Sequence, residues 1–170
     1  SGGQLFFPPG IYLFSTLTVP PGMVGLHLQG SSRRATTLRS SNLTTNALQI
    51  SRAQLLTVDG FECDTTGQKT GGAFFDLNGV SQSTFSDLRV VSPYVGFNVH
   101  GGSGSLWFRH ISMTSSNNSW EWEAGMKFQS VAGIYITDCQ IITGLSPTTG
   151  AAIDIDSGVD TIQLLDTAVG

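Results

Sequence analysis

Hydrophobic residues in this chain fall into short pairs in which the two members are separated by one residue. This period-2 alternation predicts β-strands, because a helix would instead repeat its apolar positions every three or four residues. Each predicted strand has only about three to five residues, which is too short to be stable alone. Five such pairs recur in similar surroundings: Leu48/Ile50, Phe75/Leu77, Phe97/Val99, Met126/Phe128 and Ile153/Ile155.

A turn position follows each pair after about ten residues. Apolar residues mostly lie two positions before it and one and three positions after it. The intervals between successive turn positions are 27, 23, 28 and 28 residues. The turn positions are Gly60, Asp87, His110, Asp138 and Asp166.

A strand–turn–strand unit of this length can bury its apolar side only if successive units stack on one another. Stacked units would be joined by parallel strand pairing at a spacing of ~4.8 Å. The pattern therefore predicts an all-β fold, a parallel β-helix of about six coils. A β-sandwich is the competing structure, but its turns recur every 8–12 residues without similarity between units.

The N-terminal segment 2–42 carries its own motif. It contains Gly2-Gly3, the strand Leu5–Phe7, two Pro-Pro-Gly turns at 8–10 and 20–22, and a closing strand in "TTLRSS". Proline fixes φ and glycine supplies a positive φ, so each Pro-Pro-Gly is a turn. The segment resembles the first coils of the pectate-lyase-like, right-handed parallel β-helix superfamily, which includes phage tailspikes, polysaccharide lyases and glycoside hydrolases.

The resemblance implies a right-handed, single-stranded solenoid and one continuous domain. We expect residues 1–46 to form the first coils and residues 47–170 to form the regular coils. The abrupt ends and the lack of a capping helix before the first coil predict a fragment of a longer chain, truncated at both ends.

Composition limits the partners of the chain. Its 170 residues carry a net charge of −4, and only 12% of them are charged. No basic run or stripe occurs, so nucleic acid is not an expected partner. No apolar stretch of 18 residues occurs, so membrane insertion is not expected either.

Two cysteines, Cys63 and Cys139, are the whole thiol content of the chain. The repeat places them three coil steps apart, which is ~14 Å at the strand spacing. A disulfide requires Cα atoms within about 7 Å of each other. We therefore expect two free, inward-facing thiols.

The turn positions Asp87, His110, Asp138 and Asp166 should lie one above another. Such a column is similar to acid–base machinery. A recurring feature is, however, more typical of a structural turn, in which Asp side chains cap backbone N–H groups. We favour the structural role.

Loops that follow the strands after each turn should all leave at one corner of the helix and line one flank. The longest contains "SWEWE", in which Trp120 and Trp122 would point to one side of an extended segment and Glu121 and Glu123 to the other. Tryptophan faces stack on sugar rings and carboxylates bind hydroxyls, so this loop is a candidate glycan-binding site. The alternative is that the tryptophans only clamp the loop. Weaker candidates for ligand binding on the same flank are Tyr94 and Asp64, the latter with Lys69.

Catalytic chemistry is less clear. Glu121 and Glu123 are weak catalytic candidates, and their expected separation of ~6.6 Å lies between those of retaining and inverting glycosidases. The motifs of polygalacturonases and calcium-dependent lyases are not found. Asp154, Asp156 and Asp160 are the best calcium candidates, but a solvent-facing strand explains them better, so we expect no metal and no cofactor.

Three functions remain open. The favoured one is a phage-like tailspike or other surface spike, homotrimeric and located on the virion or outside the cell, that attaches to a host by binding a polysaccharide or glycan receptor. The alternatives are a polysaccharide-degrading lyase or hydrolase and a purely structural spacer.

Overall fold

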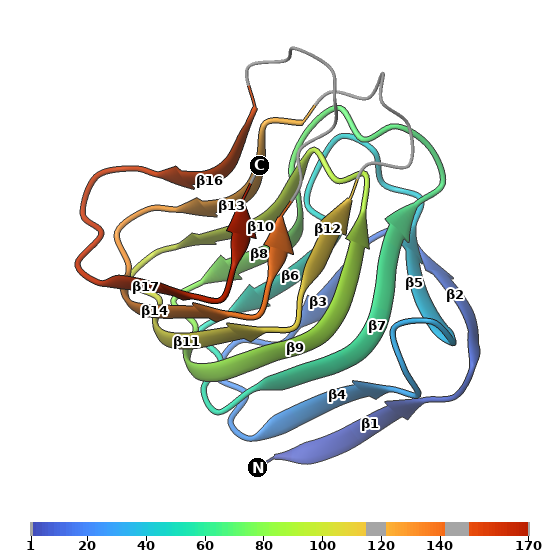
Figure 1. Ribbon diagram of the computed structural model, residues 1–170. Coiled ribbons are helices and arrows are strands. Elements are labelled where there is room, and N and C mark those ends of the chain that lie inside the picture. The colour runs from blue at the N-terminus through green and yellow to red at the C-terminus, as the bar shows by residue number, and fades with distance from the viewer. Residues whose placement is uncertain (1, 115–121, 142–149, 170) are drawn as a thin grey trace.

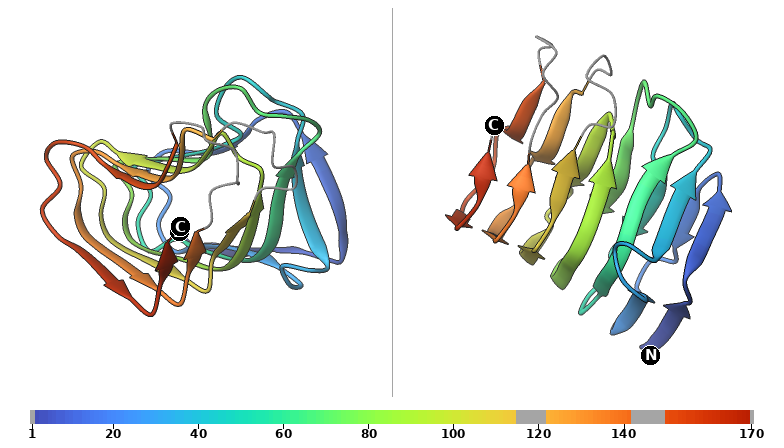
Figure 2. Two further views of the ribbon diagram at one scale, coloured as in Figure 1. Left: turned by 45° about the horizontal axis from the view of Figure 1, so that its top comes forward. Right: turned by 45° about the vertical axis from the view of Figure 1, so that its right-hand side comes forward.

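The computed structural model describes residues 2–114, 122–141 and 150–169. All of its strand pairings are parallel, and the chain winds through about six stacked coils (Figures 1 and 2). The expected parallel β-helix is confirmed. The described residues contain no helix, and so none that could cross a membrane.

Three faces form the wall of the helix. The first face contains β1 (Gly3–Phe7), β4 (Leu26–Gly30), the start of β7 (Thr57–Thr65), the start of β9 (Ser81–Val91), β11 (Gly104–Arg109), β14 (Ala132–Thr137) and β17 (Ile162–Leu165). The second face contains β2 (Gly10–Phe14), β5 (Thr36–Ser40), the ends of β7 and β9, β12 (Ser112–Thr114), β15 (Gln140–Ile141) and β18 (Ala168–Val169). The third face is a separate six-stranded sheet of β3 (Leu17–Val19), β6 (Leu48–Ser51), β8 (Ala73–Asn78), β10 (Val95–His100), β13 (Ala124–Phe128) and β16 (Ala151–Ile155).

Inward side chains of the third face stack in vertical columns. The strand register pairs the second members of the five predicted pairs one above another: Ile50, Leu77, Val99, Phe128 and Ile155. All are fully buried except Ile155 in the last coil. The predicted self-stacking of the repeat is therefore confirmed residue by residue.

Phenylalanine rings fill the centre of the core. Phe75 and Phe97 stack with ring centroids 4.4 Å apart, and Phe85 stacks on Phe108 at 5.4 Å. Phe97 meets Phe108 edge-on at 5.1 Å, which joins the two stacks across the interior. Aromatic pairs of this kind contribute about 0.5–1.5 kcal/mol beyond their burial.

The turn column marks the bend between the first and second faces. In the register, Gly60, Asp87, His110, Asp138 and Asp166 lie above one another, and their φ angles are 75°, 49°, 51°, 53° and 47°. Glycine adopts this left-handed conformation freely, and aspartate tolerates it better than most residues. The repeated residue type thus follows from the backbone of the bend, which supports the structural role.

Cys63 and Cys139 are both free and buried, as expected. Burial in the apolar interior raises the pKa of the Cys63 thiol, and the same cause raises that of Cys139. Both residues therefore act as small hydrophobic side chains.

The closest backbone approach at the bend leads to a prediction. A Cβ added at Gly60 would lie 2.7 Å from the carbonyl oxygen of Gly30, whereas one added at Gly102, whose φ is similar at 78°, would meet nothing within 4 Å. We expect Gly102→Ala to cost about 1 kcal/mol through its φ alone. Gly60→Ala should cost about 1–3 kcal/mol more, because the coils must separate.

Urea denaturation of both variants measures this difference as a shift of midpoint at constant slope. Equal losses of unfolding free energy in the two variants would show that a Cβ at position 60 does not clash with the backbone of Gly30.

Candidate functional site on the third face

Outward positions of the third face carry a ladder of polar side chains. Between the two inward members of each pair lie Gln49, Asp76, Asn98, Lys127 and Asp154, which the register places in one row across β6, β8, β10, β13 and β16. A second outward row contains Ser51, Asn78 and His100. The spacing of the strands therefore brings together residues that are more than 20 positions apart in the sequence.

Asp76 is the centre of one cluster. Its Oδ1 accepts a hydrogen bond from Asn98 Nδ2 at 2.8 Å and lies 3.1 Å from His100 Nε2. The Asp76 side chain is only 16% exposed. Two neighbours hold one carboxylate oxygen, while Oδ2 has no partner among the described residues and can accept from a ligand.

Lys127 is the centre of the next cluster. Its Nζ lies 2.9 Å from Glu123 Oε1 and 3.6 Å from Asp154 Oδ2. The hydrogen bond to Glu123 is the main cause that raises the pKa of Lys127, and both carboxylates add to the effect. The ammonium is therefore charged at neutral pH and holds two carboxylates at the surface. In the neighbouring row, Gln129 donates to Asp156 at 3.1 Å.

A shallow groove of about 290 Å³ runs beside these clusters. Its lining combines side chains from the ladder with small residues at the preceding corner of the coils: Asn46, Gly72, Ala73, Val95, Asn98, Glu123, Lys127 and Gln129. The groove thus presents a carboxylate, an ammonium and amides. This mixture suits a ligand with many hydroxyl groups.

The structure places Glu123 in this site but Trp122 in the core. Trp122 is 3% exposed, and its indole Nε1 is buried without a hydrogen-bond partner. The two side chains point to opposite sides, as the alternation predicts, but the side of Trp122 is the interior. Its ring therefore packs among apolar residues and has no free face for a sugar. Trp120 and Glu121 lie outside the described residues.

Tyr94 lies next to Glu123. Its carbonyl oxygen accepts the backbone N–H of Glu123 at 2.8 Å, which fixes the start of β13 against the preceding coil. Tyr94 and Glu123 are therefore in contact through the backbone.

Asp64 lies on the second face, away from the ladder. Its carboxylate binds the guanidinium of Arg39, with Nε–Oδ1 and Nη2–Oδ2 distances of 2.9 and 2.6 Å. The pair raises the pKa of Arg39. Both carboxylate oxygens are thus already occupied, so Asp64 is not part of the groove.

The proposed calcium ligands behave as surface residues. Asp154 faces Lys127, and Asp156 accepts from Gln129. Within the described ranges, no three His, Cys, Asp or Glu side chains converge as metal ligands would.

Asp76, Asn98, His100 and Lys127 are not among the site residues predicted from the sequence. The signal was present, because Asp76, Asn98 and Lys127 each stand between two inward members of a predicted pair. The outward position of every repeat is therefore the part of the pattern that marks the row.

Comparison with known proteins supports the fold. No protein-family model matches the chain, and no curated protein sequence matches it. Solved structures that are similar to this chain include a candidate glycosyl hydrolase from Parabacteroides merdae (TM-score 0.76, 10% identity), the catalytic domain of a GH87 α-1,3-glucanase in complex with nigerose (0.67, 14%) and ORF18 of Geobacillus virus E2 (0.67, 14%).

These similarities cover 98%, 95% and 98% of this chain, and 80%, 27% and 40% of the respective structures. The chain therefore spans less than half of the glucanase domain and of the viral protein. At such low identity the likeness is one of fold.

The corner loop before the third face yields a prediction about Lys69, which is 1% exposed. Its Nζ donates to the carbonyl oxygens of Asn42, at 3.2 Å, and of Thr45. Burial lowers the pKa of Lys69 to about 8. Because the unfolded chain holds this proton up to the ordinary pKa, the stability of the fold should rise between about pH 8 and pH 10.5.

Lys69→Met removes the buried amine and with it this dependence of stability on pH. We expect the unfolding free energy of the wild type, relative to Lys69→Met, to increase by about 1–3 kcal/mol from pH 7.5 to pH 10 in urea titrations. Lys127→Met is the control. Because the pKa of Lys127 is raised, the unfolding free energy of the wild type relative to Lys127→Met should stay constant over this pH range. A flat difference for Lys69 as well would show that its amine remains protonated.

Proposed function

We propose that this chain is a carbohydrate-binding β-helix and that a polysaccharide lies along the third face, across the strands. The observation that carries the proposal is the outward ladder of Asp76, Asn98, His100 and Lys127, with Glu123 at its edge. These groups offer hydrogen-bond donors and acceptors in three successive coils, at intervals of ~4.8 Å. A polyhydroxylated chain can satisfy such a row over several successive units.

The biological role we propose is attachment to a host glycan by a phage-like tailspike or surface spike. The viral ORF18 supports this role, because 98% of this chain is similar to part of it in fold. Under this proposal the chain belongs to the pectate-lyase-like superfamily and acts as a homotrimer on a virion or outside a cell. Sedimentation equilibrium reports the stoichiometry, and a monomeric mass would contradict the trimer.

Binding is tested by Asp76→Asn, which retains the size of the side chain and removes its charge. We expect the variant to lose about tenfold in affinity for a glycan that binds the wild type, since a hydrogen bond to a charged group contributes about 1.5–3 kcal/mol. A glycan array identifies the ligand, and isothermal titration calorimetry measures the affinity.

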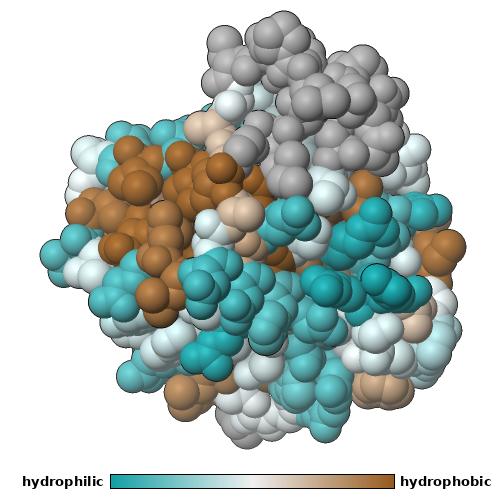
Figure 3. All heavy atoms as spheres, in the orientation of Figure 1, coloured by the Kyte–Doolittle hydropathy of each residue, from teal (hydrophilic) through white to brown (hydrophobic). Residues whose placement is uncertain are grey.

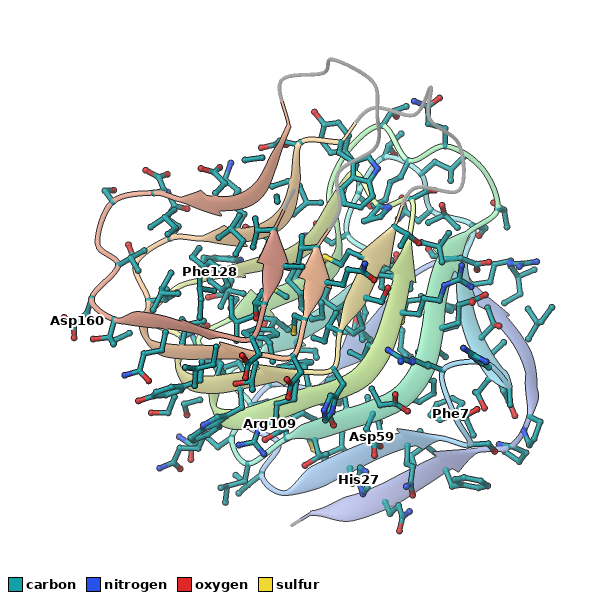
Figure 4. The ribbon with its side chains drawn as sticks, in the orientation of Figure 1. Phe7, His27, Asp59, Arg109, Phe128 and Asp160 are labelled. Atoms are coloured by element: carbon teal, nitrogen blue, oxygen red, sulfur yellow. The ribbon has the colours of Figure 1, made fainter. Side chains whose placement is uncertain are left out.

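Asp59→Asn is the matched control. Asp59 Oδ1 lies 2.9 Å from His27 Nε2 on the outer face of β4 and β7, so it has a histidine partner like that of Asp76 but lies on another face (Figure 4). The control should bind as the wild type does. Equal behaviour of the two variants would exclude the third face as the binding site.

A second candidate function is hydrolysis of the bound glycan. Its support is the pair of carboxylates, Glu123 and Asp154, held by one ammonium and 41% and 42% exposed, together with the fold that the chain shares with the glucanase domain. Glycoside hydrolysis uses two carboxyl groups, one as acid and one as base or nucleophile.

Product analysis separates the two functions. If the chain only binds, the glycan keeps its length, and Glu123→Gln or Asp154→Asn changes affinity alone. If it cleaves, new reducing ends appear, and each of these variants should reduce their rate by at least about a hundredfold. A lyase would produce unsaturated uronates instead. Absence of both binding and cleavage would favour the structural spacer.

A further inference from the structure

A second, larger groove lies on the opposite side of the coil from the third face, at the bend between the first and second faces. It encloses about 690 Å³. Its lining is mostly charged or polar: Arg33, Arg34, Glu62, Arg89, His110, Ile111, Ser112, Asp138 and Gln140. The surface around this bend is hydrophilic in Figure 3.

An insertion in the second coil forms one wall of this groove. Gln29 pairs with Asp59 and Thr37 pairs with Glu62, so residues 31–35 have no counterpart in the next coil. The loop is ordered by its own hydrogen bonds, in which Ala35 N and Thr36 N both donate to Ser32 O at 3.0 Å.

Arg33 holds the loop along the axis of the helix. Its Nε lies 3.2 Å from Asp87 Oδ1, and its Nη1 donates to the carbonyl oxygen of His110 at 3.1 Å. The insertion therefore reaches over the bends of two later coils, and the groove is a consequence of that reach.

Most charges in the groove are paired. Arg33 binds Asp87, Arg89 Nη1 lies 2.5 Å from Glu62, and His110 Nε2 lies 3.4 Å from Asp138. Arg34 is the exception: its exposed guanidinium has no partner within the described ranges. Ser112 and Gln140, from neighbouring strands of the second face, likewise have side chains without a partner there.

We infer that this groove binds an anionic saccharide unit, meaning a hydroxylated ring that carries one oxyanion group. Arg34 would bind the oxyanion through two parallel N–H donors. Ser112 and Gln140 would bind ring hydroxyls, and the volume falls within the range of small-molecule sites. Because Asp87 and Glu62 already pair with Arg33 and Arg89, Arg34 is the guanidinium of the groove that remains available for the anion. The inference does not depend on the third face.

Titration by ligand-observed NMR tests the site with four probes: glucuronic acid, glucose 6-sulfate, glucose and inorganic phosphate. We expect the two anionic sugars to bind at least about tenfold more tightly than glucose or phosphate, and to bind more weakly at 0.5 M salt. If phosphate binds as tightly as the anionic sugars, the groove binds any anion and does not recognise the sugar ring. If glucose binds as tightly as they do, the charge of the ligand does not contribute to binding. Either result overturns the inference.

Arg34→Gln should weaken binding of glucuronic acid about tenfold. The matched control is Arg109→Gln, because Arg109 is also exposed and without a partner among the described residues but lies on the outer face of β11 (Figure 4). Circular dichroism verifies the fold of both variants.

The inference fails if Arg34→Gln binds glucuronic acid as Arg109→Gln does. Asp76→Asn should leave binding in this groove unchanged, so failure of the third-face proposal and failure of this one give different results.

Discussion

In-register stacking of the coils is the constraint on which the rest of this structure depends. Each inward side chain must fit above its equivalent in the preceding coil, as Phe97 does on Phe75 with ring centroids 4.4 Å apart. The bend keeps the coils in register because every regular coil turns on a single residue with positive φ, from Gly60 to Asp166. A residue added in one coil has to leave the wall as a loop, because otherwise it would move the next apolar position to the outside.

The same constraint leaves the outward positions free for chemistry. The core does not require an aspartate at position 76 or a lysine at position 127, since both side chains point away from it. Their neighbours nevertheless lie within hydrogen-bond distance, as Asn98 does at 2.8 Å from Asp76, because strand pairing places them one step apart. A β-helix thus builds a continuous polar surface on a rigid wall, and the corners admit insertions such as residues 31–35 without disturbing the stack.

The fold was more accessible from the sequence than the site. Period-2 alternation and the recurring turn position identified the inward columns, because burial selects residue type directly. The tryptophans of the segment SWEWE did not indicate a surface site. Trp122 lies in the core at 3% exposure, since a large apolar ring gains more from burial than from exposure. Asp64 had the right chemistry but is held by Arg39 on another face. His100 lies beside Asp76 on the ladder, a contact that no pattern along a single strand indicates.

By itself, the sequence determined the direction of each side chain, inward or outward, because that direction follows from the alternation along a single strand. It also determined the register between coils, through the repeated columns. Only the tertiary structure decided which polar groups meet, because their contacts join residues from different coils. Lys127 reaches Asp154 in the next coil, and Arg33 reaches His110 across 77 positions of sequence. Such contacts depend on the paths of loops and on the lengths of side chains, and neither of these produces a periodic pattern in the sequence.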